Sequence, residues 1–332
     1  MASNAVKIGI VGAGGVAEAC HLPVLAQMPG VEVAWLCDQV RERAEKLARA
    51  WGIKRAYGDL RACPDVDAIL LAIPVGLRRE ALALAFERGW HVFAEKPFAA
   101  SAEEHLGIVQ EAARAGVQVG VGLMRRFFRS TGVARRALAS EAFGPVLEVW
   151  AAEAAHMGTT GREGSWYQSD RAAAGGGVLI ETGSHTVDQV FQVLGAESFC
   201  DLRAAFTSAG DIDLEARAVA NVKRVDAARA IPVHFVVSRL RDLYTGVVIR
   251  CEHASIRFGA DAARPVEVLG PDDSPLCTLQ GTEGGTNFYQ PFFLEWRAFL
   301  EQCRSRVPSL VDAASALLGS RFIDAAYACA SR

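Results

Sequence analysis

The sequence predicts an α/β protein in two parts: a doubly wound parallel-sheet domain, then an α+β domain with a large, mostly antiparallel open sheet. Three observations predict it. Strand-like and helix-like runs alternate as far as Gly122, and a glycine-rich turn follows the first strand-like run. Beyond about Met124, strand-like runs follow one another without long helices between them. The predicted domains therefore cover residues 1–124 and 125–332.

The pattern of apolar residues predicts each element of the first domain. Short aliphatic runs predict buried strands, and apolar positions three or four residues apart predict helices. The predicted strands cover residues 6–11, 31–36, 68–72, 91–94 and 117–122, and the predicted helices cover residues 16–28, 40–51, 77–88 and 102–115. Because strands and helices alternate, we expect a parallel sheet with right-handed connections.

The second domain is predicted in the same way. Its predicted helices cover residues 129–142, a segment running from the glycines at 175–177 to Leu194, and residues 288–303 and 309–330. Its predicted strands include residues 146–155, 216–222, 233–238, 245–251 and 254–258. A succession of strands favours antiparallel pairing.

Composition and charge exclude several classes of protein. Hydrophobic residues make up 51% of the 332, enough for large cores, and no apolar run is long enough to span a membrane. A formal charge of −3 without a run of Lys or Arg argues against binding to nucleic acid or to an anionic membrane. The eight cysteines form no Cys-x-x-Cys pair and lie beside no His at metal-ligand spacing. We therefore expect reduced thiols, no metal site and a cytoplasmic protein without an export signal.

A strand, a glycine turn and a helix start follow one another near the amino terminus. Gly12 permits a tight turn, Gly14 lets the backbone approach a pyrophosphate, and Ala17 takes the third small position, where helix and strand pack closely. Gly15 and Val16 begin the helix, whose unpaired N–H groups favour phosphate. At this first strand-helix junction, the pattern predicts an NAD(P)-binding Rossmann domain.

Asp38 follows the second predicted strand, where the ribose of a dinucleotide would lie. A carboxylate there accepts from the 2′-hydroxyl and repels a 2′-phosphate, which favours NAD over NADP. The alternative is that Asp38 caps the helix that starts near Val40. Arg41 and Arg43 follow closely, so NADP is kept as a second cofactor.

Glu95, Lys96 and Pro97 lie just beyond the predicted strand 91–94. In open α/β sheets, ligands bind at the carboxyl ends of the strands. A lysine there is usually just solvated, but one held between a glutamate and a proline favours a positioned cation. Pro97 is a candidate for a cis peptide bond.

A polar stripe follows the glycines at 175–177. Glu181, His185, Asp188 and Gln192 recur at helical spacing, which places a carboxylate and an imidazole within reach of each other. The alternative is an ordinary solvated helix face. The glycines favour a site, because they allow the backbone to approach another surface or a ligand closely.

Three motifs in order resemble the Gfo/Idh/MocA oxidoreductases, which include glucose-fructose oxidoreductase and inositol dehydrogenase. They are the turn over residues 12–17, the tripeptide over 95–97 and the glycine-rich segment over 175–188. The resemblance implies hydride transfer between a nicotinamide cofactor and a secondary alcohol of a sugar, aminosugar or cyclic polyol. It also implies a homodimer or homotetramer.

The resemblance implies catalytic roles for three residues. Lys96 and His185 would flank the substrate hydroxyl and the nicotinamide, while Glu181 would contact the sugar and orient the histidine. An imidazole with an ordinary pKa of about 6.5 suits a base at neutral pH, and a cation stabilises a developing alkoxide. Glu181 departs from the family, which usually has Asp at this place.

The loop over residues 71–78 departs further from the family. It resembles a cofactor-contacting segment in which Ile73, Val75 and Arg78 replace the usual Thr, Asn and His, while Pro74 is kept. By resemblance, Ile73, Pro74 and Glu95 are candidate cofactor contacts, and Arg78 is a candidate phosphate partner.

Three further residues, Arg126, Trp166 and Tyr167, are candidates. Arg126 is expected beside the nicotinamide or the substrate, whereas Arg125 is expected to be a helix-start or surface arginine. Trp166 and Tyr167 are candidates to stack on a sugar ring, with burial in a loop core as the alternative.

Two other functions stay open. One is an NAD-binding sensor or regulator that kept the fold and lost turnover, which the glutamate at position 181 keeps open. The other is a glycosidase that oxidises its substrate transiently with NAD.

Overall fold

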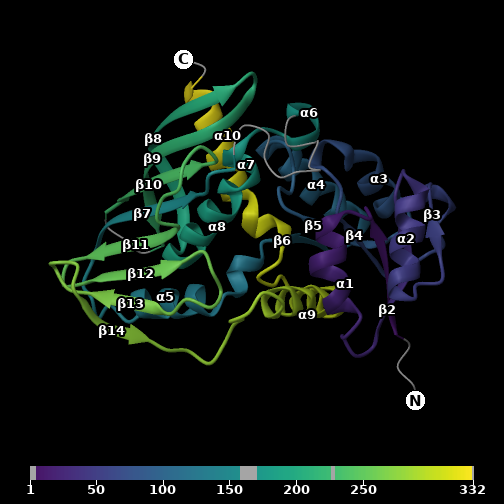
Figure 1. Cartoon of the computed structure of the whole chain (residues 1–332), viewed down its shortest axis with the longest axis horizontal. Helices are drawn as coiled ribbons and strands as arrows, with labels where there is room; N and C mark the ends of the chain where they lie inside the picture. The colour runs from purple at the N-terminus through teal and green to yellow at the C-terminus, as the bar shows by residue number, and fades with distance from the viewer. Residues whose placement is uncertain (1–4, 158–169, 226–228, 331–332) are drawn as a thin grey trace. The chain divides into compact units, whose positions relative to one another are not determined.

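The computed structural model describes residues 5–157, 170–225 and 229–330 (Figure 1). By its internal contacts the chain divides into two compact units. Unit 1 is Met1–Leu123 with Phe292–Ser315, and unit 2 is Met124–Pro291 with Ala316–Arg332. The predicted domain boundary between residues 124 and 125 stays a prediction. That boundary assigns residues 292–315 to the second domain, whereas the internal contacts assign them to unit 1.

Unit 1 contains a six-stranded sheet in the order β3-β2-β1-β4-β5-β6. All of its strand pairs are parallel. The strands are β1 (Val6–Val11), β2 (Val31–Cys37), β3 (Ala56–Tyr57), β4 (Ala68–Leu71), β5 (His91–Glu95) and β6 (Val119–Gly122). The strand order reverses between β1 and β4, and this switch point is where doubly wound sheets bind ligands. The predicted doubly wound fold is confirmed.

Helices and single turns connect these strands. They are η1 (Ala17–His21), α1 (Leu22–Leu25), α2 (Arg41–Trp51), η2 (Leu60–Ala62), η3 (Val75–Leu77), α3 (Arg79–Glu87) and α4 (Ala102–Ala115). The helix predicted over residues 16–28 is a π-helical turn followed by one short α-helix. In α4, Ser101 accepts a hydrogen bond from the amide of Glu104, and Gly116 ends the helix at a φ of 68°.

The carboxyl-terminal segment of unit 1 completes its core. It consists of most of α9 (Gln290–Ser305) and of the chain leading into η6 (Ala313–Ala316). The rings of Trp296 and Phe299 pack on Phe93 of β5, with centroid distances of 4.7 and 5.2 Å. Val121 of β6 donates to the carbonyl of Val311 at 2.8 Å, so this segment covers the edge of the sheet.

Unit 2 contains an eight-stranded sheet in the order β14-β13-β12-β11-β7-β10-β9-β8. The β7–β10 pair is parallel and the other pairs are antiparallel, which confirms the predicted mostly antiparallel sheet. The strands are β7 (Val146–Ala154), β8 (Ala196–Ala209), β9 (Ile212–Arg224), β10 (Ile231–Ser238), β11 (Gly246–Cys251), β12 (Ser255–Gly259), β13 (Val266–Leu269) and β14 (Pro275–Leu279).

Helices cover one face of this sheet (Figure 1). The helices that pack on it are α5 (Arg129–Ala139), α7 (Val178–Glu181), α8 (Gly183–Leu194) and α10 (Leu317–Ala330). Unit 2 also contains η4 (Met124–Phe127) and α6 (Arg171–Ala174). Alternate residues of the strands point into the core, where Val149 and Phe235 meet Phe191 of α8 and Phe322 of α10. On the opposite face, the Trp150 side chain is 46% exposed and stacks on His234 at 3.9 Å.

Within the three described stretches of chain, no helix is both long and apolar enough to cross a bilayer.

Candidate active site

The glycine turn follows β1 at the carboxyl edge of the unit 1 sheet. Gly12 has a φ of +102°, and a Cβ atom there would lie 2.5 Å from the carbonyl oxygen of Ala72. This position therefore requires glycine. At Gly14 and Gly15 an added Cβ would meet nothing within 4 Å. The backbone of the turn is thus open on the side of these two glycines, as close approach to a pyrophosphate requires.

Asp38 holds the glycine turn. Its Oδ2 accepts from the amide of Ala13 at 2.9 Å, and its Oδ1 accepts from the amide of Val40 at 2.9 Å. It does not cap α2, whose N-cap residue is Val40 without a side-chain cap. A carboxylate has about four lone-pair directions, so acceptor capacity remains for a ribose hydroxyl. The turn and Asp38 together fit a dinucleotide.

Lys96 follows β5, at the same edge of the sheet as the glycine turn. The amide of Lys96 donates to Oε2 of Glu95 at 3.0 Å, so the buried glutamate holds the backbone of the lysine next to it. The Lys96–Pro97 peptide is cis.

The Glu95 carboxyl is part of a buried network behind this turn. Trp296 donates its indole N–H to Nδ1 of His21 at 2.9 Å, and Nε2 of His21 lies 2.9 Å from Oε1 of Glu95. Because an indole N–H can only donate, Nδ1 is an acceptor and the proton lies on Nε2, which donates to Glu95. Burial on its own would raise the pKa of Glu95, but the hydrogen bond from His21 and the positive charges of Lys96 and Arg78 lower it.

Glu295 of α9 lies beside this network and was not among the residues predicted from the sequence. Its side chain is 0% exposed, and neither carboxyl oxygen has a hydrogen-bond partner in the part of the chain that the structure describes. Burial and the charge of Glu95 raise its pKa well above the ordinary value. Ligand atoms of His21, Glu95 and Glu295 lie within 4.8 Å of one another. Since Nε2 of His21 carries a proton, this arrangement does not present a metal-ligand set.

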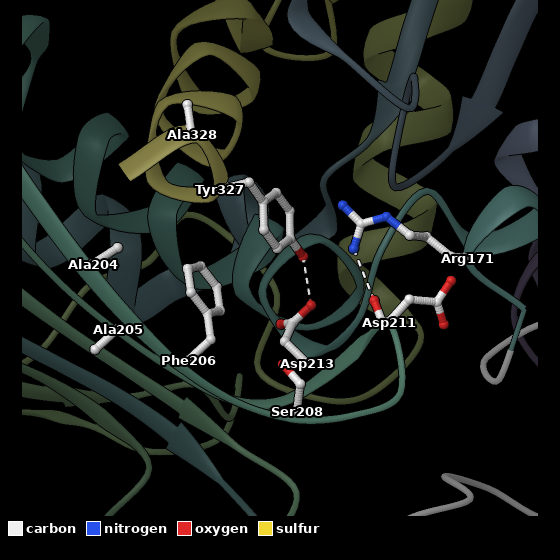
Figure 2. Close-up of a pocket in the computed structure, with 9 residues that line it drawn as sticks. All are labelled: Arg171, Ala204, Ala205, Phe206, Ser208, Asp211, Asp213, Tyr327 and Ala328. Carbon is white, nitrogen blue, oxygen red and sulfur yellow. Dashed lines mark hydrogen bonds between the residues drawn. The ribbon is translucent and has the colours of Figure 1, made fainter. Parts of the chain in front are cut away.

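In unit 2, the glycines at 175–177 bring the backbone onto a buried carboxylate. The amides of Gly177 and Leu179 each donate to Asp213 at 2.8 Å. The hydroxyl of Tyr327 also donates to Asp213 at 2.8 Å, a bond that Figure 2 shows. A Cβ atom on Gly177 would lie 2.2 Å from the carbonyl oxygen of Asp213. Asp213, which was not predicted from the sequence, therefore fixes the start of α7.

A pocket of about 560 Å³ lies beside this anchor (Figure 2). Arg171 donates to the carbonyl of Asp211 at 2.8 Å and lies over the ring of Tyr327, which stacks on Phe206. The residues that line the pocket are Arg171, Ala204, Ala205, Phe206, Ser208, Asp211, Asp213, Tyr327 and Ala328.

Glu181 and His185 lie on two successive short helices rather than on one. α7 ends at Glu181 and α8 begins at Gly183. Oε2 of Glu181 accepts from the hydroxyl of Thr182 at 2.6 Å and lies 3.3 Å from Nη2 of Arg239. Arg239 is 2% exposed and was not among the residues predicted from the sequence. The longer Glu side chain at position 181 reaches a buried guanidinium in this protein.

The rest of the predicted polar stripe is partly buried. Asp188 is 6% exposed, and its two oxygens accept from Arg126 at 2.8 and 2.5 Å. The expected surface position of Arg125 is wrong, because this side chain is buried and paired with Glu153 at 2.7 and 2.5 Å. Two carboxylates that face the core hold these arginines in place.

Trp166 and Tyr167 lie outside the described residues. The other candidate residues are divided between the units. Unit 1 carries the glycine turn, Asp38, the loop at Ile73 and Lys96, and unit 2 carries Arg126, Glu181 and His185.

Two family-wide sequence patterns match the chain. Residues 6–123 match the oxidoreductase family with an NAD-binding Rossmann fold, and residues 132–257 match the GFO/IDH/MocA C-terminal domain. The chain belongs to the Gfo/Idh/MocA oxidoreductase family. The resemblance inferred from the sequence is thus confirmed, as is an NAD-binding Rossmann domain at the amino-terminal end.

Several curated relatives of this Gfo/Idh/MocA protein are named dehydrogenases. D-glucoside 3-dehydrogenase of Escherichia coli is 28% identical over 198 residues, which are 59% of this chain and 56% of the relative. The scyllo-inositol 2-dehydrogenase (NAD(+)) of Bacillus subtilis is 26% identical over 195 residues, 58% of this chain and 55% of the relative. The matched region thus spans little more than half the length of these relatives.

Solved structures share the fold of the chain. Aldose-aldose oxidoreductase from Caulobacter crescentus, complexed with glycerol, matches with a TM-score of 0.84 at 18% identity over 98% of both chains. Levoglucosan dehydrogenase, in complex with NADH and L-sorbose, matches with a TM-score of 0.84 at 18% identity over 99% of this chain and 97% of that one.

Proposed function

We propose that this protein transfers a hydride between NAD and a secondary alcohol of a sugar, aminosugar or cyclic polyol. One observation carries the proposal. The glycine turn and Asp38 lie at the same edge of one parallel sheet as Lys96, because β1, β2 and β5 all end there. A cofactor cradle and a candidate cation at one sheet edge are what a nicotinamide dehydrogenase needs. The names of the curated relatives support the class of substrate.

The proposed chemistry divides into a hydride and a proton. NAD, when bound, supplies the acceptor for the hydride. His185 takes the proton from the substrate hydroxyl, because imidazole titrates near neutral pH. Lys96 stabilises the negative charge that develops on the same oxygen. In this proposal both side chains act on one hydroxyl group.

The remaining candidate residues orient the cofactor and the substrate. Gly12, Gly14, Gly15, Val16, Ala17, Asp38, Ile73, Pro74, Glu95 and Arg126 are proposed cofactor contacts, and Arg126, Trp166, Tyr167 and Glu181 are proposed substrate contacts. Glu181 is held by Thr182 and Arg239, so its carboxylate is presented to the substrate in a fixed direction.

The test is a spectrophotometric survey. Purified protein is mixed with NAD or NADP and a panel of sugars, aminosugars, inositols and glycosides, while the absorbance of the reduced cofactor is followed. We expect reduced cofactor to form with at least one polyol or sugar and with NAD in preference to NADP. Binding of NAD without turnover would indicate a sensor, and glycoside cleavage without net reduction would indicate a glycosidase.

We also propose that the protein is a cytoplasmic homodimer or homotetramer. The outer face of the unit 2 sheet carries exposed apolar residues. Among them, Trp150 is 46% exposed and Val219 is 40% exposed. A second copy of the same face would cover them. The eight cysteines, all within the described part of the chain, form no disulfide with one another, as is usual in a reducing compartment.

A further inference from the structure

Arg78 lies between two loops that leave the same edge of the unit 1 sheet. β4 ends at Leu71 and β5 ends at Glu95, and the two strands pair in parallel. Arg78 follows η3 and is 3% exposed. A guanidinium group buried to this extent needs hydrogen-bond acceptors around it, since an uncompensated buried charge is costly.

Backbone carbonyl groups from both loops supply these acceptors. Nε of Arg78 donates to the carbonyl of Ile73 at 2.9 Å, within the loop after β4. Its Nη1 donates to the carbonyls of Glu95 and Pro97, each at 2.5 Å, and that of Phe98 lies at 3.4 Å. The residues immediately before and after Lys96 are therefore both bound by one side chain. This use of the guanidinium differs from the phosphate partner suggested by the sequence.

We propose that Arg78 is a positioning residue that holds Lys96 in place for the reaction. The Glu95 carboxylate fixes the amide of Lys96, and Arg78 fixes the carbonyls on either side of it. Through Ile73, Arg78 also ties this turn to the loop that is a candidate cofactor contact. The inference rests on the proposed function, because Arg78 acts on the chemistry only through Lys96.

The chemistry of the side chain explains why arginine is needed here. Its planar fork carries five N–H donors and a permanent charge, so it can bind several carbonyls in different directions at once. A lysine offers one compact charge, and a histidine offers at most two N–H groups. The histidine usual in the family at this position cannot make the same set of bonds. Arg78→Lys and Arg78→His should therefore restore only part of the function lost in Arg78→Met.

The first experiment measures how rigidly the backbone around Lys96 is held, and it needs no catalytic activity. Amide hydrogen exchange is followed in the full-length protein for the wild type, Arg78→Met, Arg78→Lys and the matched control Arg79→Met. Arg79 is the next residue, but its side chain is 59% exposed and pairs with Glu111 on the surface. We expect exchange in the peptide over residues 95–101 to become about tenfold faster in Arg78→Met, with β2 unchanged. Unchanged exchange at 95–101 would overturn the proposal.

The second experiment tests whether Arg78 acts through Lys96. Turnover is measured for Arg78→Met, Lys96→Met and the double variant. We expect Arg78→Met to lower kcat about tenfold or more while the KM for NAD changes less, and to add no further loss when Lys96 is already replaced. Additive losses would show a general structural role and refute positioning. If Arg78→Met does not fold, Arg78→Lys takes its place in both experiments.

The two proposals fail in different ways. A wild-type protein that reduces no cofactor with any substrate of the panel refutes the proposed dehydrogenase, and the hydrogen-exchange result still decides whether Arg78 holds the turn. Normal turnover in Arg78→Met, with active wild type and inactive Lys96→Met, refutes the role of Arg78 and leaves the dehydrogenase standing.

Discussion

Lys96 and His185 are the two residues on which the proposed chemistry depends. Replacing either one by alanine should lower turnover by about 100-fold or more. The substitution of Lys96 removes the positive charge that stabilises the transition state, and that of His185 removes the group that accepts the proton. The affinity for NAD, measured by quenching of protein fluorescence, should change much less. Lys54→Ala and His253→Ala remove exposed side chains and serve as controls. Normal turnover in Lys96→Ala or His185→Ala would remove that residue from the catalytic set.

Glu295 gives the protein a pH-dependent stability that can be measured without a substrate. Its pKa is raised in the folded state, so the folded protein keeps a proton that the unfolded chain releases above its ordinary pKa. The free energy of unfolding should therefore fall as the pH rises from the unfolded pKa toward the folded one. The slope is up to about 1.4 kcal/mol per pH unit.

Glu295→Gln removes this slope. Glutamine has nearly the same shape as the protonated acid and does not titrate, so the variant should gain stability relative to the wild type as the pH rises from 5.5 to 7.5. Urea unfolding at several pH values measures the difference. The contribution of Glu95, whose lowered pKa acts in the opposite direction at acid pH, is common to both proteins and cancels. A constant difference across this range would show that Glu295 is ionised in the folded protein.

At the scale of elements, the start of α7 depends on one carboxylate from β9. Asp213→Ala would remove the acceptor of the Leu179 amide and of the Tyr327 hydroxyl, and would leave the Gly177 amide only its longer bond of 3.3 Å to that hydroxyl. We expect a loss of about 3 kcal/mol in the free energy of unfolding, measured by urea unfolding. Asp211→Ala is the matched control, because only the backbone carbonyl of Asp211 accepts from Arg171. Equal stability of the two variants would show that Asp213 does not anchor the helix.

The elements themselves could largely be predicted, because apolar periodicity is a local property of the sequence. The strands β1, β2, β5 and β7 lie within one residue of their predicted ends. The predicted helix from the glycines at 175–177 to Leu194 is interrupted at Thr182, between α7 and α8. Periodicity does not detect such a break when the residues on both sides keep helical spacing.

The partners of the candidate residues could not be predicted, because they come from distant parts of the chain. Asp213 lies 36 residues from Gly177, and Arg239 lies 58 residues from Glu181. The sequence marks neither residue, because Asp213 alternates with Asp211 and Glu215, and Arg239 is followed two residues later by Arg241. A charge on an otherwise apolar helix face is a signal that the sequence does carry. Glu295 is the clearest example, since it lies on the same helical face as Phe292, Trp296 and Phe299. Such a residue is expected to be buried.

At the scale of the whole molecule, the open sheet face of unit 2 governs the proposed assembly. Trp150→Glu places a charge among the exposed apolar residues of this face, so we expect a dimer or tetramer to dissociate toward monomers. Multi-angle light scattering at micromolar concentration measures the mass. Trp51→Glu changes a tryptophan that is 36% exposed on α2 of unit 1 and is the control. A monomeric wild type would contradict the proposed assembly.

The return of residues 292–315 to unit 1 determines when that unit can be completed during synthesis. Residue 315 follows residue 123 by 192 positions, which a ribosome translates in roughly 10 to 40 seconds. Until then, Phe93 of the nascent chain lacks its partners Trp296 and Phe299, and the edge of β6 lacks the segment at Val311 that covers it. Most of unit 1 is thus synthesised first, but its core is completed only near the end of translation. A fragment that ends after Leu123 would therefore expose aromatic core residues and tend to aggregate.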